Sequence, residues 1–325
     1  MRFENVVRVA DLLARPDSPV ELVDTIAGST ISEWHDQRSQ LSHPVVNGPI
    51  RLFELKDGFV ELRSGAAFLT SGQLIAESIV WHPLHFLMNS PRPPRMGSTG
   101  FLEDFSVMPS SSFYHFLIED LPRVVWVLQR YPSRRLVGSV NLPSYARESA
   151  LLIAESLSST SATHVRVHNY PFVSFPPESG GWPTRETVDA VRSLGFSWLP
   201  RNASKPGEKI YLSRLRDSRS PVNERDVVDL TIRNGYTPVD AKDLSLLEQI
   251  STFRVASRVL GVHGAGLTNS VWMPTGAQVT EIMDPTYYNP CYQWLSHILG
   301  LEHSTVVNSG DTPNVVDIEK LEQRL

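Results

Sequence analysis

The sequence predicts an α/β protein, with a β-rich N-terminal segment and a parallel, doubly wound sheet in its C-terminal part. Three observations support this prediction. The chain has 325 residues, and at about 150 residues per domain this length favours two domains. Hydrophobic residues make up 41% of the chain and charged residues 20%, a balance that allows a sizeable core and excludes a disordered chain. From residue 209 onward, short apolar runs alternate with helical patterns.

The N-terminal segment, 1–100, has mainly strand and turn patterns. Apolar runs at 50–55 and 59–62 flank a short polar stretch that contains Asp57 and Gly58. An Asp-Gly pair supplies the positive φ that a tight hairpin turn requires. We therefore expect a β-hairpin centred on these two residues.

The middle of the chain predicts βαβ units, because strand and helix patterns alternate there. A helical pattern extends from Phe113 to Gln129, and Pro122 should interrupt it. The other expected elements are strands at 136–140 and 164–167, helices at 144–157 and 184–194 with Gly195 closing the second helix, and a loop at 171–183.

The C-terminal part has the clearest pattern. Its expected strands lie at 209–213, 236–239, 258–262 and 278–282. Asn223 suits the N-cap of a helix that Gly235 ends, and Ser245 and Glu248 have the spacing of a capping box. Strands that alternate with helices at this spacing predict a parallel, doubly wound sheet, and such sheets bind ligands beyond the carboxyl ends of their strands.

The segment HGAGLTN at 263–269 directly follows the expected strand 258–262 and precedes a helical pattern. Gly264 and Gly266 would let the backbone approach a ligand closely, and the N–H groups at the start of a helix bind anions. Two interpretations fit this segment. It is either a cradle for a diphosphate or an ordinary turn between a strand and a helix, since a glycine-rich loop alone is a weak signal.

Arginines follow the first expected strand of the C-terminal sheet, at the edge that should also carry His263. A guanidinium binds phosphate oxygens with two parallel hydrogen bonds, so Arg214 and Arg219 could neutralise a diphosphate. The alternative is a solvated loop in which these arginines pair with Asp217 or Glu224.

An imidazole and two carboxylates lie close together among large apolar residues around His115. Partial burial would bring the pKa of His115, Glu119 or Asp120 into the range that a general base requires. A histidine that only satisfies the core is the other interpretation. His115 and Glu119 also have the i, i+4 spacing of metal ligands, and His82 and His85 form an H-x-x-H pair, but neither pair has a further ligand set, so we predict no metal site.

Glu281 ends an apolar strand pattern at the edge where ligands should bind. Its carboxylate suits either hydrogen bonds from sugar hydroxyls or a buried contact with the loop that follows. The aromatic residues shortly after it suit stacking on a base or sugar as well as packing of the last helix. These residues are Tyr287, Tyr288, Tyr292 and Trp294.

Charge and cysteine content exclude several classes of protein. The chain has 30 basic and 35 acidic residues, a net charge of -5, and no basic run that could follow a phosphate backbone, so nucleic acid is not an expected partner. Cys291 is the single cysteine, which excludes an internal disulfide framework and fits a reducing compartment. The sequence has no stretch typical of a secretory signal or a membrane span, so we expect a cytoplasmic protein, with peripheral contact to the inner face of a membrane left open.

Together these segments resemble the glycosyltransferase 61 family, and the resemblance depends on their joint order and spacing over about 105–300. The matching pieces are YHF at 114–116, DLPR at 120–123, YLSR at 211–214 with Arg219, Asn223 and Glu224, LSLLEQ at 244–249, HGAGLTN at 263–269, and Pro274, Gly276 and Glu281. The chain departs from the family at 270–273, where SVWM replaces residues that are usually Leu-Leu-Phe-like, and in lacking the membrane anchor or secretory signal of plant and animal members.

The resemblance implies a GT-B fold, in which two Rossmann-like domains face each other across a cleft. The expected division is a β-rich segment at 1–100, an acceptor-side domain at 101–203 and a donor domain at 204–325. The resemblance also implies an inverting reaction without an essential metal. A nucleotide-sugar, by resemblance UDP-linked, would be the co-substrate, with no other cofactor, and a glycan or glycolipid would be the acceptor.

By position, the resemblance places the base in the 113–120 segment, where we expect His115 first and Asp120 or Glu119 second. It places donor binding at Arg214, Arg219, Asn223, His263, Gly264, Ala265, Gly266, Leu267, Asn269 and Glu281. The expected function is a hexosyl- or pentosyltransferase in surface polysaccharide synthesis. A non-catalytic glycan-binding or scaffold protein with the same fold is the alternative. A serine hydrolase is disfavoured, because the chain has no G-x-S-x-G nucleophile elbow.

Overall fold

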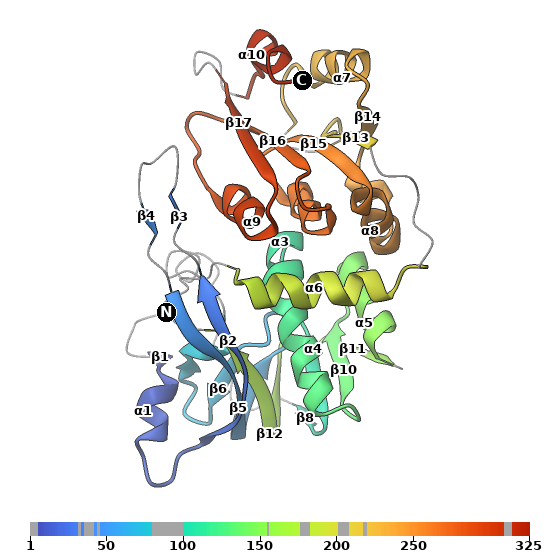
Figure 1. Cartoon of the computed structure of the whole chain (residues 1–325). Helices are drawn as coiled ribbons and strands as arrows, with labels where there is room; N and C mark the ends of the chain where they lie inside the picture. Colours follow the sequence, from blue (N-terminus) through green and yellow to red (C-terminus); the bar gives the residue numbers. More distant parts are fainter. Residues whose placement is uncertain are drawn as a thin grey trace. The chain divides into compact units, whose positions relative to one another are not determined.

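The computed structural model describes residues 6–31, 34–35, 42–43, 46–79, 100–154, 156–175, 183–200, 208–216, 220–308 and 314–325. The chain divides into two compact units. Unit 1 comprises Met1–Glu33 and Pro44–Thr187, and unit 2 comprises Trp34–His43 and Val188–Leu325. Both units contain strands and helices (Figure 1), so the predicted α/β class is confirmed.

A mixed sheet in unit 1 has the strand order β1-β7-β6-β5-β12-β8, with β2 also paired to β5. β5 (Val46–Glu61) pairs antiparallel with β12 (His164–Ser174). Phe53 of β5 and Phe172 of β12 stack in the apolar core on one face of this sheet. The other elements of this part are β1 (Val6–Val7), α1 (Val9–Leu13), β2 (Val20–Ile31), β6 (Ala67–Leu69), β7 (Leu74–Ile75), η2 (Ala76–Ser78) and β8 (Gly100–Leu102).

The expected hairpin at Asp57 and Gly58 is wrong, because β5 continues through both residues. Gly58 pairs with Leu69 of β6 on one side and with Val167 of β12 on the other. A Cβ atom on Gly58 would lie 2.2 Å from the carbonyl oxygen of Phe68. Glycine is therefore needed here because neighbouring backbone approaches closely, and not because a turn requires positive φ.

The second sheet of unit 1 is parallel, with the order β11-β10-β9, and it confirms the predicted βαβ units. Its elements are β9 (Phe105–Met108), β10 (Arg135–Ser139), α5 (Ser144–Ile153) and β11 (Leu157–Thr160). The predicted helix at 144–157 is thus too long, because its last residue begins β11. The predicted strand at 164–167 is too short, because β12 continues to Ser174 through residues that were expected to form a loop.

The helical pattern at 113–129 forms one continuous segment. α3 (Phe113–His115) leads into a π-helical turn, η3 (Phe116–Asp120), and then into α4 (Leu121–Arg130). Pro122 does not interrupt the segment, because it lies at the start of α4, where its missing N–H removes no hydrogen bond of that helix. π-Helical turns are frequent at functional sites, and this one contains Glu119 and Asp120.

Unit 2 contains the predicted parallel sheet, with the strand order β14-β13-β15-β16-β17. Its strands are β13 (Glu208–Leu212), β14 (Thr237–Val239), β15 (Ala256–Val262), β16 (Gln278–Met283) and β17 (Glu302–Val307). In Figure 1, α7 (Glu224–Arg233) and α10 (Ile318–Glu322) lie on one face of this sheet, and α8 (Leu246–Arg254) and α9 (Cys291–Leu299) lie on the other. Helices on both faces of a parallel sheet make it doubly wound, as predicted.

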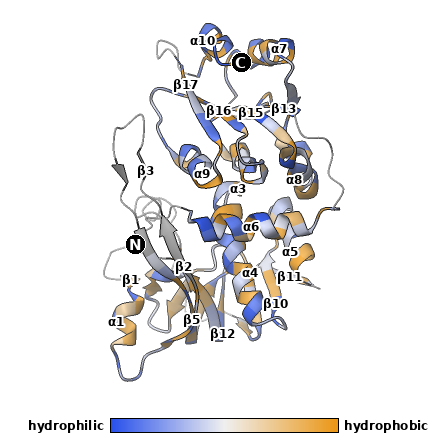
Figure 2. Ribbon diagram, in the orientation of Figure 1, coloured by the Kyte–Doolittle hydropathy of each residue, from blue (hydrophilic) through white to orange (hydrophobic). Residues whose placement is uncertain are grey.

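α7 of unit 2 buries one side against the sheet. Figure 2 shows both hydrophilic and hydrophobic residues on this helix, as expected for a half-buried helix. Val227 and Leu230 of α7 join Tyr211 of β13 and Leu260 of β15 in one buried cluster. Further elements with residues of unit 2 are β3 (Trp34–His35), β4 (Ser42–His43), α6 (Arg185–Ser197), η5 (Ala241–Asp243) and the 3-10 helix η6 (Ala265–Trp272).

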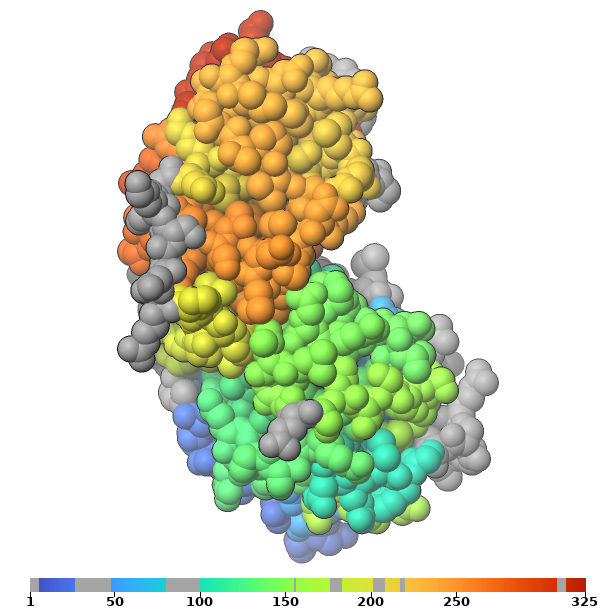
Figure 3. All heavy atoms as spheres, turned by 90° about the vertical axis from the view of Figure 1, so that its right-hand side faces the viewer, coloured from blue at the N-terminus to red at the C-terminus, as the bar shows by residue number. Residues whose placement is uncertain are grey.

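An edge of the unit 2 sheet is formed by β14. Figure 3 views the molecule from this side, where the gold residues, which include α7 and α8, form the outer face of unit 2. β14 is three residues long and includes Pro238, which has no N–H to donate. A short edge strand with a proline gives another chain little opportunity to pair.

Local signals for helix ends in unit 2 are partly confirmed. Ser245 and Glu248 form the predicted capping box, and Gly235 after α7 has a φ of +79°. Asn223 precedes α7 but does not cap it with its side chain. Its amide instead donates to the carbonyl oxygen of Val316 and accepts from the N–H of Val316, both at 2.9 Å.

The prediction that Gly195 closes a helix is wrong, because α6 continues to Ser197. A Cβ atom on Gly195 would lie 2.4 Å from Cζ3 of Trp272, whose side chain is buried. The glycine in α6 therefore makes room for an aromatic ring of η6, and this requirement overrides the usual preference of glycine for helix ends.

Candidate functional site

The strand order of the unit 2 sheet reverses between the adjacent strands β13 and β15. From β13 the chain moves to β14 on one side, and from β15 it moves to β16 on the other side, so the segments after β13 and β15 leave in opposite directions. Ligands of doubly wound sheets bind at such a switch point. Arg214 follows β13 and His263 follows β15, and Nη1 of Arg214 donates a 2.9 Å hydrogen bond to the carbonyl oxygen of His263. The structure thus brings the arginine segment and the glycine-rich segment together.

The glycine-rich segment lies against the Arg214 guanidinium. A Cβ atom on Gly264 would lie 3.1 Å from Nη1 of Arg214, so the glycine leaves space for the guanidinium. Gly266 is less crowded, since its nearest neighbours would be methyl groups of Leu212 at 3.9 Å. The chain would therefore accept alanine at Gly266 more easily than at Gly264.

The 3-10 helix that begins at Ala265 has buried side chains. Leu267 is 1% exposed and Asn269 is fully buried. Nδ2 of Asn269 donates to Oε1 of Gln249 at 2.8 Å and to the carbonyl oxygen of Gly266 at 3.2 Å. The Asn269 side chain thus holds the glycine-rich segment to Gln249 and is not exposed to a ligand.

A buried carboxylate anchors the Arg214 segment. Glu224, which is 2% exposed, accepts hydrogen bonds from the hydroxyl of Tyr211 at 2.8 Å, the hydroxyl of Ser213 at 3.1 Å and the N–H of Arg214 at 2.7 Å. The sequence indicated Glu224 as a favourable charge at a helix start, as a partner for an arginine side chain and as one of the residues that carry the family resemblance, but not as an acceptor for the backbone of Arg214.

Three residues from adjacent strands form a buried chain of hydrogen bonds beside this point. Nδ1 of His263 lies 2.5 Å from Oε1 of Glu281, and Nε2 of His303 lies 3.1 Å from Oε2 of Glu281. Glu281 is 1% exposed. Burial alone would raise the pKa of its carboxyl, but the hydrogen bonds and charges of the two histidines outweigh burial and hold that pKa below its ordinary value. Sequence reasoning missed His303, because only the pairing of β16 with β17 brings it to Glu281.

Two tyrosines surround the His263 ring. The ring centroids of Tyr287 and Tyr292 lie 5.2 Å and 5.3 Å from that of His263. Tyr292 is buried, and its hydroxyl donates a 2.7 Å hydrogen bond to the carbonyl oxygen of Gly264. Trp294 is also buried, whereas Tyr287 is 52% exposed. Among these aromatic residues, Tyr292 and Trp294 pack the interior and Tyr287 is accessible beside the switch point.

The acidic cluster predicted around His115 lies in unit 1. Nδ1 of His115 is 2.9 Å from Oε1 of Glu119, one helical turn later. Ser111 donates a 2.5 Å hydrogen bond to Oδ2 of Asp120. The side chain of His115 is 28% exposed, whereas that of Glu119 is 5% exposed, and Asp120 is buried as well. Of the three candidate bases, His115 is the one that a substrate can reach.

Burial governs the protonation of this cluster. It raises the pKa of Glu119, and it raises that of Asp120 to about 7, although hydrogen bonds and the charge of Arg123 act in the opposite direction. Burial also lowers the pKa of the His115 imidazole, but the hydrogen bond and negative charge of Glu119, together with Asp120, leave it above its ordinary value. Protons therefore bind to this cluster more readily than to the same groups in water.

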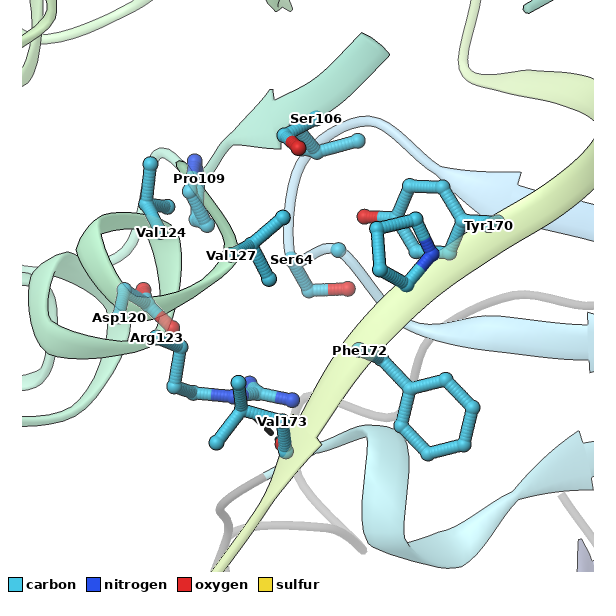
Figure 4. Close-up of a pocket in the computed structure, with 13 residues that line it drawn as sticks. Ser64, Ser106, Pro109, Asp120, Arg123, Val124, Val127, Tyr170, Phe172 and Val173 are labelled. Atoms are coloured by element: carbon cyan, nitrogen blue, oxygen red, sulfur yellow. Dashed lines mark hydrogen bonds between the residues drawn. The ribbon is translucent and has the colours of Figure 1, made fainter. Parts of the chain in front are cut away.

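A small cavity lies beside Asp120 in unit 1 (Figure 4). Polar side chains in its wall come from Ser64, Ser106, Asp120, Arg123 and Tyr170. Nε of Arg123 donates a 3.0 Å hydrogen bond to the carbonyl oxygen of Val173, which fixes the guanidinium at the wall. The cavity has a volume of about 30 Å³, whereas ligand pockets have roughly 300 Å³ or more. It therefore has room for water but not for a sugar.

Some predicted residues lie outside the described part of the chain. They are Arg219, Asp217, His82 and His85. Within the described ranges, no group of three or more His, Cys, Asp or Glu side chains is arranged to hold a metal ion. In those same ranges, no helix has the length and apolar character needed to cross a membrane.

Comparison with known proteins relates just over half of the sequence to one family. The family model described as Glycosyltransferase 61 matches residues 113–280, which is just over half of the 325-residue chain. A curated rice protein (Oryza sativa subsp. japonica) named beta-1,2-xylosyltransferase RCN11 is 33% identical over 75 residues. That match covers 23% of this chain and 14% of the rice protein. The family match includes His115, Arg214 and His263 and ends one residue before Glu281.

Proposed function

Because the chain belongs to the glycosyltransferase 61 family, we propose that it is an inverting glycosyltransferase that moves a sugar from a nucleotide-sugar to a hydroxyl group of a glycan. UDP is the proposed nucleotide, and synthesis of a surface polysaccharide is the proposed role. The name of the rice relative makes xylose the first donor sugar to test, although hexoses belong to the same proposal. The proposal includes the GT-B arrangement of two Rossmann-like domains.

The observation that carries this proposal is the contact of Arg214 with the glycine-rich segment at the switch point. Negative charge builds up on the diphosphate as it leaves the sugar. A guanidinium can donate two hydrogen bonds to phosphate oxygens, and backbone N–H groups of a glycine-rich segment can add more. In this proposal, Arg214 and the backbone at 264–266 provide the stabilisation that a divalent ion provides in metal-dependent enzymes, with Arg219 as a second donor.

The proposed base is His115, because it is the most exposed member of the acidic cluster. Glu119 accepts a hydrogen bond from Nδ1 of the ring and so orients it, as a carboxylate does for many catalytic histidines. Nε2 then takes the proton of the acceptor hydroxyl. The acceptor oxygen forms a bond to the anomeric carbon on the face opposite the diphosphate, and the bond from that carbon to the phosphate oxygen breaks, with its electron pair going to the diphosphate.

A transfer assay tests the proposal. The chain is incubated with UDP-xylose, UDP-glucose and other nucleotide-sugars, each with a panel of oligosaccharide and glycolipid acceptors, and free nucleoside diphosphate is measured. We expect acceptor-dependent release of UDP, a product of inverted anomeric configuration by NMR, and unchanged turnover in EDTA.

Two outcomes would contradict the proposal. Retained anomeric configuration would exclude the inverting reaction. A chain that binds nucleotide-sugars but releases no nucleotide with or without acceptor would instead be the alternative, a non-catalytic glycan-binding or scaffold protein. Thermal stabilisation by each nucleotide provides the binding control, because a ligand at 100 times its Kd adds about 2.7 kcal/mol of stability.

A further inference from the structure

The hydrogen-bonded chain His263–Glu281–His303 has no role in the reaction as proposed above, in which the arginines and the backbone at 264–266 bind the diphosphate. Its three side chains come from the end of β15, from β16 and from β17. The side chain of His263 is 13% exposed, that of His303 is 8% exposed and that of Glu281 is 1% exposed. His263 is the most exposed of the three and its carbonyl accepts from Arg214, so it is the member that a ligand at the switch point would touch first.

The hydrogen bonds define which ring nitrogen of each histidine carries a proton. An ionised carboxylate only accepts hydrogen bonds, so the nitrogen that faces it must be an N–H donor. Nδ1 of His263 and Nε2 of His303 are these donors. Within the described residues, the His263 ring forms hydrogen bonds through Nδ1 alone. Nε2, at the opposite edge of the ring, is therefore left for a ligand.

We propose that Glu281 and His303 are positioning residues for His263. They hold the His263 ring with Nδ1 against Glu281, so that Nε2 forms a hydrogen bond with the donor diphosphate. This inference rests on the proposed function. In the imidazolium form the ring donates from both nitrogens, to Glu281 and to a phosphate oxygen at the same time. His303 is needed because it satisfies the second oxygen of Glu281, which would otherwise be a buried acceptor without a partner.

The location of these residues supports a role at the donor site. Arg214 binds the backbone carbonyl of His263, and Tyr292 binds that of Gly264. The carbonyl groups of His263 and of the residue after it are thus both held, and Glu281 holds the ring itself. The charged and titratable groups around this ring are Arg214 after β13, Glu281 on β16, His303 on β17, Tyr287 before α9 and Tyr292 on α9.

A matched set of variants tests the inference. His303→Gln keeps an N–H donor for Glu281, and His303→Leu removes it. Glu281→Gln keeps the shape of the side chain but offers only one acceptor oxygen, so one of the two imidazoles must change the nitrogen that carries its proton. Glu302→Ala, at an exposed neighbour of His303 on β17, is the control for general effects on the strand.

Two measurements are made on each variant. Titration calorimetry gives the affinity for UDP, and ¹⁵N NMR of histidine-labelled protein gives the protonated nitrogen of His263, which is assigned with His263→Ala. We expect a proton on Nδ1 of His263 in the wild type, both free and with UDP bound. We expect His303→Leu and Glu281→Gln to lose this pattern and about tenfold in UDP affinity, and His303→Gln and the control to stay within about twofold.

The inference is overturned if His303→Leu keeps both the wild-type ring protonation and the wild-type affinity. Should His303→Leu not fold, the near-isosteric Glu281→Gln decides in the same way. If the wild type binds no nucleoside diphosphate, the proposed function fails, and ring protonation in the free protein still decides whether Glu281 and His303 orient His263.

Discussion

The two clusters of this protein each place a histidine against a buried glutamate, but the glutamates differ in how many hydrogen bonds they accept. In unit 2, both oxygens of Glu281 are bonded to imidazoles, and the pKa of the carboxyl is lowered. In unit 1, Oε1 of Glu119 is bonded to His115, whereas Oε2 has no hydrogen-bond partner among the described residues, and the pKa is raised. At Glu119 burial outweighs one imidazole, whereas at Glu281 the hydrogen bonds and charges of two imidazoles outweigh burial.

This difference suits two kinds of work. A carboxylate that stays ionised is a constant anchor, which is what a site needs to hold a histidine in one orientation. In unit 1 the pKa of Glu119 and that of the His115 imidazole it orients are both raised, so this pair binds a proton more readily, which suits His115 as the proposed general base. The predictions that follow test this division between an anchoring cluster in unit 2 and a proton-binding cluster in unit 1.

The largest effect is expected for His115→Ala, because removal of a general base costs about 10²- to 10⁴-fold in turnover. The measurement is the rate of UDP release with donor and acceptor. Only the neutral imidazole can take a proton, and its pKa is raised, so wild-type turnover should fall on the acid side with an apparent pKa above 6.5. His168→Ala, at an exposed histidine of unit 1 that contacts Asp57, is the control. Full turnover of a folded His115→Ala protein would move the base to Glu119 or Asp120.

The next largest effect is expected on how the free energy of unfolding changes with pH. The Asp120 carboxyl has its pKa raised from 3.8 to about 7, so the folded chain binds a proton that the unfolded chain releases between these values. The contribution of Asp120 to the free energy of unfolding is fully present below about pH 4 and is lost as the pH rises to about 7. The total loss is about 4 kcal/mol. Asp120→Asn should remove that loss. Urea unfolding at pH 4 and pH 8 gives the difference in unfolding free energy between the wild type and Asp120→Asn. If this difference is the same at both pH values, the raised pKa of Asp120 is contradicted.

Glu281→Gln should show the opposite dependence on pH in the same assay. The pKa of Glu281 is lowered, so its ionised form stabilises the folded chain above about pH 4.5 and this stability is lost as the pH falls through the lowered value. The substitution should therefore cost most near neutral pH and least in acid. If Asp120→Asn and Glu281→Gln changed stability with the same sign of pH dependence, the contrast between the two clusters would be wrong.

Packing at Gly195 provides a smaller, purely steric test within unit 2. A methyl group there would overlap the buried Trp272 ring, and overpacking of this kind costs about 1–3 kcal/mol. Gly195→Ala should thus lower the free energy of unfolding by that amount in urea. Gly266→Ala, whose methyl group would meet its nearest neighbours at 3.9 Å, is the matched control and should be close to neutral for stability.

Local sequence signals predicted those parts of the fold that local chemistry decides. The capping box at Ser245, the apolar strands of unit 2 and the alternation of strand and helix depend on neighbours in the chain, and they are confirmed. Gly58 and Gly195 were misinterpreted as a turn and a helix end. Glycine has the same local signature whether it supplies positive φ or makes room for a distant group, and only tertiary contacts with Phe68 and Trp272 distinguish the two cases.

The candidate site was predictable where it follows from topology. Arg214 and the segment at 263–269 come after adjacent parallel strands, so their meeting at one edge of the sheet could be expected. The supporting residues could not be predicted in the same way. His303 reaches Glu281 only through the register of β16 and β17, and Glu224 reaches the Arg214 backbone only because α7 buries its first turn.

The most direct test of the central claim, that Arg214 at the switch point binds the donor diphosphate, is a comparison of UDP and uridine binding by calorimetry. Arg214→Ala should weaken UDP binding by about 10- to 100-fold, as expected for hydrogen bonds to a charged group, and leave uridine binding unchanged. Equal weakening of both ligands, or unchanged affinity for UDP, would show that the guanidinium does not bind the diphosphate.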